Sequence, residues 1–261
     1  MTCTPVPRVY ELRGPLAATA LDWLHVHAEV QGAIEGDELI TVWLAEAAPP
    51  LPFAVHVREL AVDPAASAIT GLENDAAIFV AADLLVRPPW VERPAGFSGI
   101  ELIVPRGGAF GSGEHASTQA ALRCLHAVWD APPTFADIGT GSGILALYAH
   151  VRGCPSIAAC DIDAASVAAA QELLPAAAVH LGGAETMPKV AGLVANMTAS
   201  ELRAAMPSIL ARWRQTHVLV LSGLRATEVD DIAALVPHAV AHRVTVDAFT
   251  ALAYRGSAVV R

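Results

Sequence analysis

The sequence has few cysteines, and none of them lies in a metal-binding pattern. The four cysteines are Cys3, Cys124, Cys154 and Cys160. They form no Cys-x-x-Cys pair, and no cluster of Cys and His has the spacing of a zinc site. We therefore predict free thiols in a reducing compartment and no metal site.

The sequence also lacks a membrane-spanning run and a secretion signal. No window of about 18 residues is free of charge and turn residues, and residues 1–8 contain prolines but no apolar stretch of the signal-peptide type. The hydrophobic fraction is 54% and the mean hydropathy is +0.46, which is ample for a buried core. We expect a soluble, cytoplasmic protein.

An excess of basic charge is absent as well. The chain has 16 Lys and Arg against 26 Asp and Glu, which gives a formal net charge of −10. A protein that binds duplex or ribosomal RNA is expected to present a basic face. The acidic balance favours a small molecule or a basic protein as the partner, with no direct nucleic acid.

The first 98 residues predict a small domain and a linker. Arg8–Arg13 alternates as a strand does, Pro15–Glu29 has the apolar spacing of a helix, and the next stretch resembles a hairpin that turns at Gly36 and Asp37. Residues 1–60 therefore predict a small α+β domain. Residues 61–98 are weakly patterned and end in a proline-rich stretch, which predicts a linker.

From residue 99 to residue 261 strands and helices alternate. The first strand of this part is expected at 100–105, and two strands joined by a turn are expected at the C-terminal end. Regular alternation predicts an α/β fold of the Rossmann-like type, a parallel sheet with helices on both faces. Ligands bind such sheets at the carboxyl ends of the strands.

A glycine-rich turn joins one predicted strand to the following helix. In "FADIGTGSGIL" the glycines are Gly139, Gly141 and Gly143. Their spacing is G-x-G-x-G, and Ile144 occupies the place of the third glycine of a dinucleotide fingerprint. The turn therefore favours S-adenosylmethionine, which has no phosphate. Asp137 either contacts the methionine end of that cofactor or caps the turn.

Acidic residues follow on the next predicted strand. Asp161 in "CDID" lies roughly 20 residues past the glycines, where a carboxylate binds a ribose diol. Asp163 is expected to be the N-cap of the next helix. The alternative is that both aspartates are caps or solvent-exposed groups.

Several motifs together resemble the ribosomal protein L11 methyltransferase (PrmA) family. "VPRGGAFGSGEHASTQAAL" is similar to the family's first motif, and "DIGTGSGILAL", "CDIDAASVAAAQ" and "LVANMTASEL" follow in the family's order. The resemblance implies a seven-stranded methyltransferase domain preceded by a small substrate-recognition domain. It also implies S-adenosylmethionine as the cofactor, and a ribosomal protein as the partner.

The resemblance carries roles onto single residues. Thr118 matches a threonine beside the methionine moiety, and Gly139 and Gly141 match glycines under the cofactor. Asp161 matches the ribose carboxylate, and Asn196 matches an asparagine of the cofactor site that faces methyl transfer. Phe110 and His115 match the aromatic and the histidine of the first motif.

The expected chemistry is transfer of a methyl group to an amine, either a lysine side chain or an N-terminal amine. The acceptor must lose a proton, and the Asn196 carbonyl oxygen is suited to accept a hydrogen bond from it and orient its lone pair. Asn196 is thus the candidate catalytic residue, unless it is only a turn residue at a strand end. His115 is either a base or a structural residue.

Three other functions remain open. The first is a methyltransferase of the same fold that acts on another protein or a small amine. The second is a module that binds S-adenosylmethionine without turnover, which would need Asp161 and the glycines but not Asn196. The third, a nicotinamide-dependent oxidoreductase, is disfavoured by Ile144. The sequence does not indicate the oligomeric state.

Overall fold

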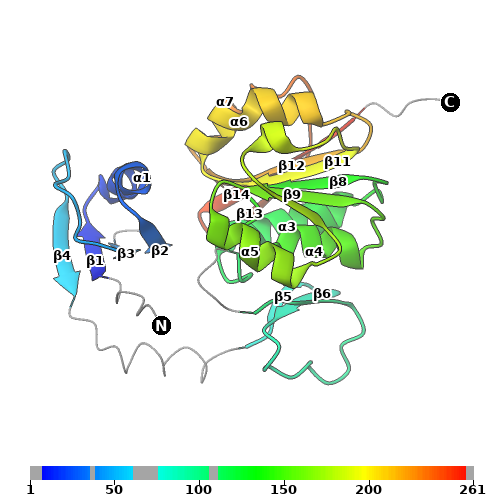
Figure 1. The fold of residues 1–261 in the computed structure, drawn as a ribbon, viewed down its shortest axis with the longest axis horizontal. Helices are drawn as coiled ribbons and strands as arrows, with labels where there is room; N and C mark the ends of the chain where they lie inside the picture. The colour runs from blue at the N-terminus through cyan, green and yellow to red at the C-terminus, as the bar shows by residue number, and fades with distance from the viewer. Residues whose placement is uncertain (1–7, 36–38, 61–75, 106–110, 257–261) are drawn as a thin grey trace. The chain divides into compact units, whose positions relative to one another are not determined.

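The chain separates into two units. The computed structural model describes residues 8–35, 39–60, 76–105 and 111–256. By their internal contacts the units are Met1–Asp75 and Ala76–Arg261 (Figure 1). The boundary between them falls inside the segment 61–98 that the sequence assigns to a linker.

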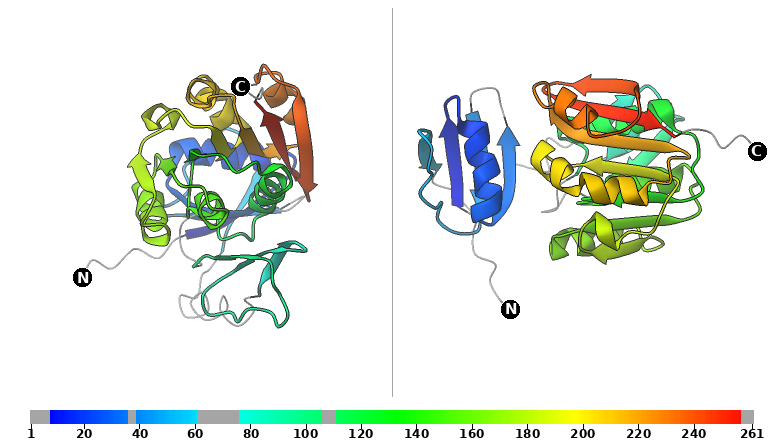
Figure 2. Two further views of the ribbon diagram at one scale, coloured as in Figure 1. Left: turned by 90° about the vertical axis from the view of Figure 1, so that its right-hand side faces the viewer. Right: turned by 90° about the horizontal axis from the view of Figure 1, so that it is seen from above.

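The described residues of the first unit form an antiparallel sheet with one helix packed on it. Its elements are β1 (Arg8–Arg13), α1 (Ala17–His27), β2 (Val30–Glu35), β3 (Leu39–Leu44) and β4 (His56–Leu60), and the strand order is β2-β3-β1-β4. Helix α1 lies along the sheet (Figure 2). Leu21 and Leu24 of the helix pack with Leu12 and Val42 of the strands in one apolar core. The predicted turn at Gly36 and Asp37 lies outside the described residues.

The connection from β3 to β4 is irregular. Both strands are antiparallel to β1, which lies between them, so the chain must cross over the sheet to join them. Residues 45–55 make this crossing without a helix. Prolines at positions 49, 50 and 52 disfavour a helix there. Leu51, Phe53 and Val55 pack against the apolar core instead.

The second unit contains a seven-stranded sheet in the order β10-β9-β8-β11-β12-β14-β13. Its strands are β8 (Phe135–Ile138), β9 (Ile157–Asp161), β10 (Ala178–Leu181), β11 (Gly192–Asn196), β12 (Val218–Arg225), β13 (Val240–Val246) and β14 (Phe249–Arg255). The first five strands are parallel, and β14 pairs antiparallel with both β12 and β13. The predicted Rossmann-like α/β fold is confirmed.

Helices cover both faces of this sheet (Figure 1). Helices α3 (Ala116–Val128), α4 (Ile144–Val151) and α5 (Ala164–Leu173) lie on one face, and α6 (Ala199–Arg212) and α7 (Val229–Ala233) lie on the other. The chain leaves β8 toward β9 on one side and returns to β11 on the other. The strand order therefore reverses between β8 and β11, and α/β sheets bind their ligands at such a point.

Residues 76–103 form a second, smaller sheet, which differs from the predicted linker. Strands β5 (Ile78–Ala81) and β6 (Leu84–Arg87) pair antiparallel, and β7 (Ile100–Ile103) pairs parallel to β6. The strand expected at 100–105 thus belongs to this sheet. The seventh strand of the large sheet is β10, which the sequence analysis missed. One face of the small sheet is buried in the core of the second unit, through Val80, Leu84 and Leu102.

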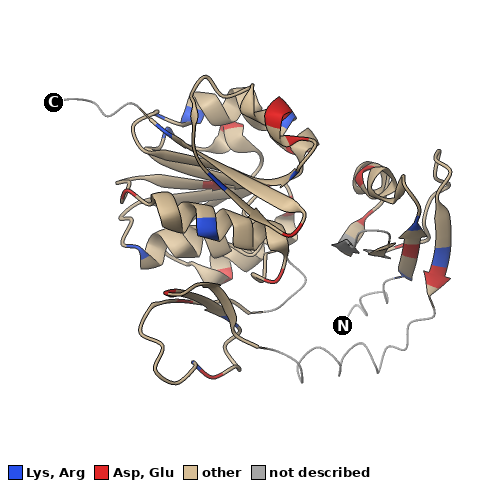
Figure 3. Cartoon of the chain, turned by 180° about the vertical axis from the view of Figure 1, so that it is seen from behind, with Lys and Arg blue, Asp and Glu red and all other residues tan. Residues whose placement is uncertain are grey.

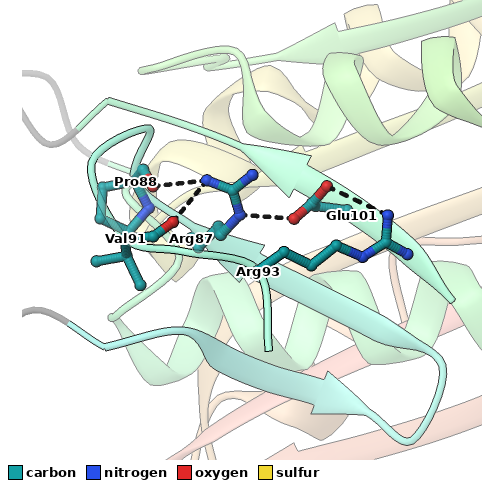
Figure 4. Close-up of polar contacts among 5 residues, drawn as sticks. All are labelled: Arg87, Pro88, Val91, Arg93 and Glu101. Carbon is teal, nitrogen blue, oxygen red and sulfur yellow. Dashed lines mark hydrogen bonds and ion pairs between the residues drawn. The ribbon is translucent and has the colours of Figure 1, made fainter. Parts of the chain in front are cut away.

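A charged cluster fixes the proline-rich loop between β6 and β7. The Arg87 Nε donates to Glu101 Oε1 at 2.6 Å, and the Arg87 Nη1 donates to the carbonyls of Pro88 and Val91 (Figure 4). Arg93 lies 3.8 Å from the other Glu101 oxygen. These bonds give residues 88–93 a defined path although they contain little regular structure.

Among the described residues, none of the helices has both the length and the apolar character needed to cross a bilayer. Cys124, Cys154 and Cys160 are buried free thiols, and Cys3 lies outside the described residues.

Candidate functional site

The glycine-rich turn joins β8 to α4 at the point where the strand order reverses. Gly139, Gly141 and Gly143 all have positive φ, at 66°, 53° and 89°. This backbone conformation favours glycine. At Gly139 a Cβ would also lie 2.8 Å from the side chain of Met197, which follows β11. Gly139 and Gly141, both predicted cofactor residues, therefore lie at the end of the strand in backbone conformations that favour glycine.

Asp161 ends the adjacent strand β9 and faces this turn. Its Oδ2 accepts a hydrogen bond from the Gly141 N–H at 2.9 Å, and its Oδ1 accepts one from the Asp163 N–H at 3.0 Å. An ionised carboxylate has about four acceptor positions, so two remain for a ligand. Asp163 caps α5 by accepting from the N–H groups of Ala165 and Ser166, which confirms its predicted role.

Asp137 lies in β8, just before the turn, and its side chain is fully buried. Its Oδ2 accepts from the Thr140 hydroxyl at 2.7 Å and from the Ala146 N–H at 3.0 Å. Its Oδ1 is buried, and no hydrogen-bond partner for it is found among the described residues. Burial raises the pKa of Asp137 to about 7, against the lowering effect of its hydrogen bonds. The residue thus caps the turn and also holds an unsatisfied oxygen.

Asn196 ends β11, the strand on the other side of the point where the strand order reverses. Its Nδ2 donates to Thr118 Oγ1 at 3.4 Å, which brings together two residues that the sequence analysis predicted for one site. Thr118 is fully buried in the first turn of α3. Within the described part of the chain, Asn196 Oδ1 is buried and has no partner. A buried acceptor without a donor costs about 1–3 kcal/mol, so a ligand that supplied a donor here would be stabilised.

His115 has a structural position at the start of α3. Its Nδ1 accepts from the N–H of Ser117 and lies 2.7 Å from the Ser117 hydroxyl, so the side chain caps the helix. The ring lies 4.7 Å from that of Phe249. This geometry supports the structural alternative for His115. Phe110 lies outside the described residues.

Two residues near this site were not identified from the sequence. Ile162 follows Asp161 and is 79% exposed, the highest value for a large apolar side chain among the described residues. Its position between Asp161 and Asp163 at the end of β9 is the sequence signal that could have identified it. Ser222, inside β12, is fully buried and donates its hydroxyl to the Ser117 carbonyl at 2.9 Å. No local sequence pattern marks that contact.

The site therefore gathers at the carboxyl ends of β8, β9 and β11. Asp137 and the glycines come from β8, Asp161 from β9 and Asn196 from β11. The described ranges hold no group of three or more His, Cys, Asp or Glu side chains placed to bind a metal ion. The acceptor groups at this edge suit a nucleoside with cationic groups.

This fold and this site define a Rossmann-like methyltransferase domain. Comparison with known families agrees, because residues 76–247 match the family model described as ribosomal protein L11 methyltransferase (PrmA). The chain belongs to that family.

Individual relatives support the assignment. A ribosomal protein L11 methyltransferase of Geotalea uraniireducens is 34% identical over 164 residues, which cover 56% of this chain and 52% of that protein. One from Dechloromonas aromatica is 32% identical over 218 residues, 80% of this chain and 73% of its own length. The chain thus spans about half the length of the first relative.

A solved structure shows the same arrangement. The ribosomal protein L11 methylase of Lactobacillus delbrueckii subsp. bulgaricus superposes with a TM-score of 0.62 and 26% sequence identity. The superposition covers 69% of this chain and 98% of the other.

Proposed function

We propose that this chain is an S-adenosylmethionine-dependent N-methyltransferase that modifies amino groups of a ribosomal protein, with ribosomal protein L11 as the first candidate. Family membership supports the reaction class. The observation that carries the proposal is a pair of buried oxygens on adjacent strands, Asp137 Oδ1 and Asn196 Oδ1, for which the described residues supply no hydrogen-bond partner.

The residues fit S-adenosylmethionine, which carries an ammonium and a sulfonium charge. A carboxylate oxygen and an amide oxygen without donors suit those cationic groups and a nearby amine. Asp161 has acceptor positions left for the two ribose hydroxyls, and the exposed Ile162 side chain beside it offers an apolar surface to a base. We assign Thr118, Gly139, Gly141, Asp161 and Asn196 to the cofactor site.

When bound, the cofactor supplies an electrophilic methyl group for direct displacement by an amine. The task of the chain is to orient the amine and to keep it neutral. Lysine and α-amines have ordinary pKa values of about 10.4 and about 8, and burial beside a positive charge lowers them. Asn196 Oδ1 then accepts a hydrogen bond from the neutral amine and aligns its lone pair, which is why Asn196 is the proposed catalytic residue.

Residues 1–60 are proposed to recognise the protein substrate. All the proposed cofactor residues lie in the second unit, and the first unit has its own sheet and core. Lys and Arg positions in Figure 3 are spread over several elements and interspersed with acidic ones, and the net charge is −10. This balance favours a basic protein over a nucleic acid as partner. A ribosomal protein substrate would place the reaction in the cytoplasm.

The test is methyl transfer from labelled S-adenosylmethionine to purified ribosomal protein L11, with the modified residues located by mass spectrometry. Calorimetry with S-adenosylhomocysteine measures cofactor binding separately. Transfer to L11 supports the proposal. Transfer only to another protein or to a small amine favours the first alternative function. Cofactor binding without transfer to any acceptor favours the binding module.

A further inference from the structure

Strand β12 contains an irregularity close to the proposed catalytic residue. Its register with β14 shifts between Leu221 and Leu224. Both leucines pack into the same apolar cluster, although residues three apart in a regular strand face opposite sides of a sheet. One extra residue is therefore inserted at Ser222–Gly223, which makes this a β-bulge. Bulges are enriched next to active sites, where they redirect a side chain.

The bulge brings the backbone of β12 against the turn that follows Asn196. The Met197 N–H donates to the Ser222 carbonyl at 3.1 Å. Gly223 has φ of 93°, and a Cβ at this position would overlap the backbone carbonyl of Met197. The glycine thus permits a close approach of two backbones, and this approach fixes the position of the Asn196–Met197 peptide.

The side chain of Ser222 reaches the other half of the site. It points to the α3 side of the sheet, where its hydroxyl donates to the Ser117 carbonyl at 2.9 Å. Ser117 directly precedes Thr118, which accepts from the Asn196 amide. Ser222 therefore holds both segments, one by its backbone and the other by its hydroxyl.

The orientation of the Asn196 amide depends on this arrangement. An asparagine amide has two donors on nitrogen and two lone pairs on oxygen, and rotation about χ2 exchanges their positions. Because Nδ2 is bonded to Thr118, Oδ1 is the atom that has no partner among the described residues. A rotated amide would turn an N–H toward the N–H of the acceptor amine and could not align it.

We propose that Ser222 is a positioning residue for methyl transfer, which acts through the Ser117–Thr118 turn to fix the orientation of the Asn196 amide. This inference rests on the proposed function. Ser222 itself touches neither cofactor nor acceptor; it sets the distance between Thr118 and Asn196.

Kinetics of Ser222→Ala, with the full chain, test the proposal. A nucleophile misplaced by about 1 Å costs about a hundredfold in rate, so we expect kcat to fall by about 10- to 100-fold, with a much smaller change in the KM for S-adenosylmethionine. Ser222→Thr keeps the hydroxyl and should recover part of the loss. Thr250→Val is the matched control, because it removes the buried hydroxyl of Thr250 in β14, which hydrogen-bonds with the Thr245 hydroxyl in β13. It should leave kcat unchanged at a similar melting temperature.

A second readout does not depend on turnover. The sequence contains only two asparagines, Asn74 and Asn196, so labelling with ¹⁵N-asparagine gives two side-chain amide signals, which Asn74→Gln assigns. In Ser222→Ala the Asn196 signal should shift and its protons should exchange faster with water, with no such change in Thr250→Val. An unchanged Asn196 signal, or a kcat equal to that of the wild type, would overturn the proposal. If the wild type transfers no methyl group, the proposed function fails, while the amide signal still tests the role of Ser222.

Discussion

The buried carboxylate of Asp137 allows a quantitative prediction. Its pKa is raised from 3.8 to about 7, chiefly by burial. Each pKa unit corresponds to about 1.36 kcal/mol, so a rise of about three units changes the free energy of unfolding by about 4 kcal/mol between low and high pH. Below about pH 4 Asp137 is protonated in both states, and this contribution to stability is fully present. It is lost as the pH rises through about 7, because the folded state binds the proton more tightly.

Asp137→Asn should remove this dependence. The amide oxygen can still accept from Thr140 and Ala146, while its nitrogen replaces the unpartnered Oδ1. The variant should therefore match the wild type near pH 4 and exceed its unfolding free energy by up to about 4 kcal/mol at pH 8. Its affinity for S-adenosylmethionine should fall by about 1.5–3 kcal/mol, because the cation loses a charged acceptor.

Denaturant unfolding at pH 4, 6 and 8, with calorimetry of cofactor binding at each pH, measures both effects. Wild-type affinity should increase as the pH rises through about 7, since a bound cation favours ionised Asp137. Asp163→Asn is the control, because desolvation of this exposed cap is outweighed by its hydrogen bonds to Ser166 and Ala165, which lower its pKa. The variant should therefore lose stability at pH 8, the opposite sign to Asp137→Asn, and leave cofactor affinity unchanged. A variant of Asp137 that is no more stable at pH 8 and binds the cofactor as tightly as the wild type would refute the reasoning.

Three further outcomes follow from the site. Asp161→Ala should weaken cofactor binding by about 1.5–3 kcal/mol, measured by calorimetry; equal affinity in a folded variant would reject the ribose role. Asn196→Ala should lower turnover on a verified substrate about a hundredfold, much more than it lowers cofactor affinity, and near-normal turnover would leave it a turn residue. A chain that starts at Ala76 should bind S-adenosylhomocysteine but lose activity on the natural substrate; absence of binding in a folded truncation, judged by circular dichroism, would contradict the proposed division.

The alternation of strands and helices in the second unit was predictable because most of its elements are specified by their own local sequence. Strands β8, β9, β11 and β12 are short, mostly apolar runs, and some helices carry their own caps, such as Asp163 for α5. Strand β10 was missed because it is an edge strand of four residues with mostly exposed side chains. An edge strand needs no continuous apolar run, so its sequence carries a weak signal.

The small sheet was missed for a different reason. Strands β5 and β6 have four residues each, and β6 pairs in parallel with β7 across a loop that the Arg87–Glu101 bond organises. Such pairing depends on contacts between distant segments, whereas the proline-rich loop between them is typical of a linker. Composition alone therefore indicated a linker where the chain folds back on itself.

The candidate site shows the same limit at the level of single atoms. The glycines, Asp161 and Asn196 were predictable because the spacing of residues around a strand end is a local property. Which atom of Asn196 is left without a partner is not local: its amide bonds a residue 78 positions away, and the Ser222 hydroxyl that supports this contact bonds a carbonyl 105 positions away. The sequence thus names the catalytic candidate, but only the packing of α3 against β11 and β12 determines whether its oxygen or its nitrogen can meet an amine.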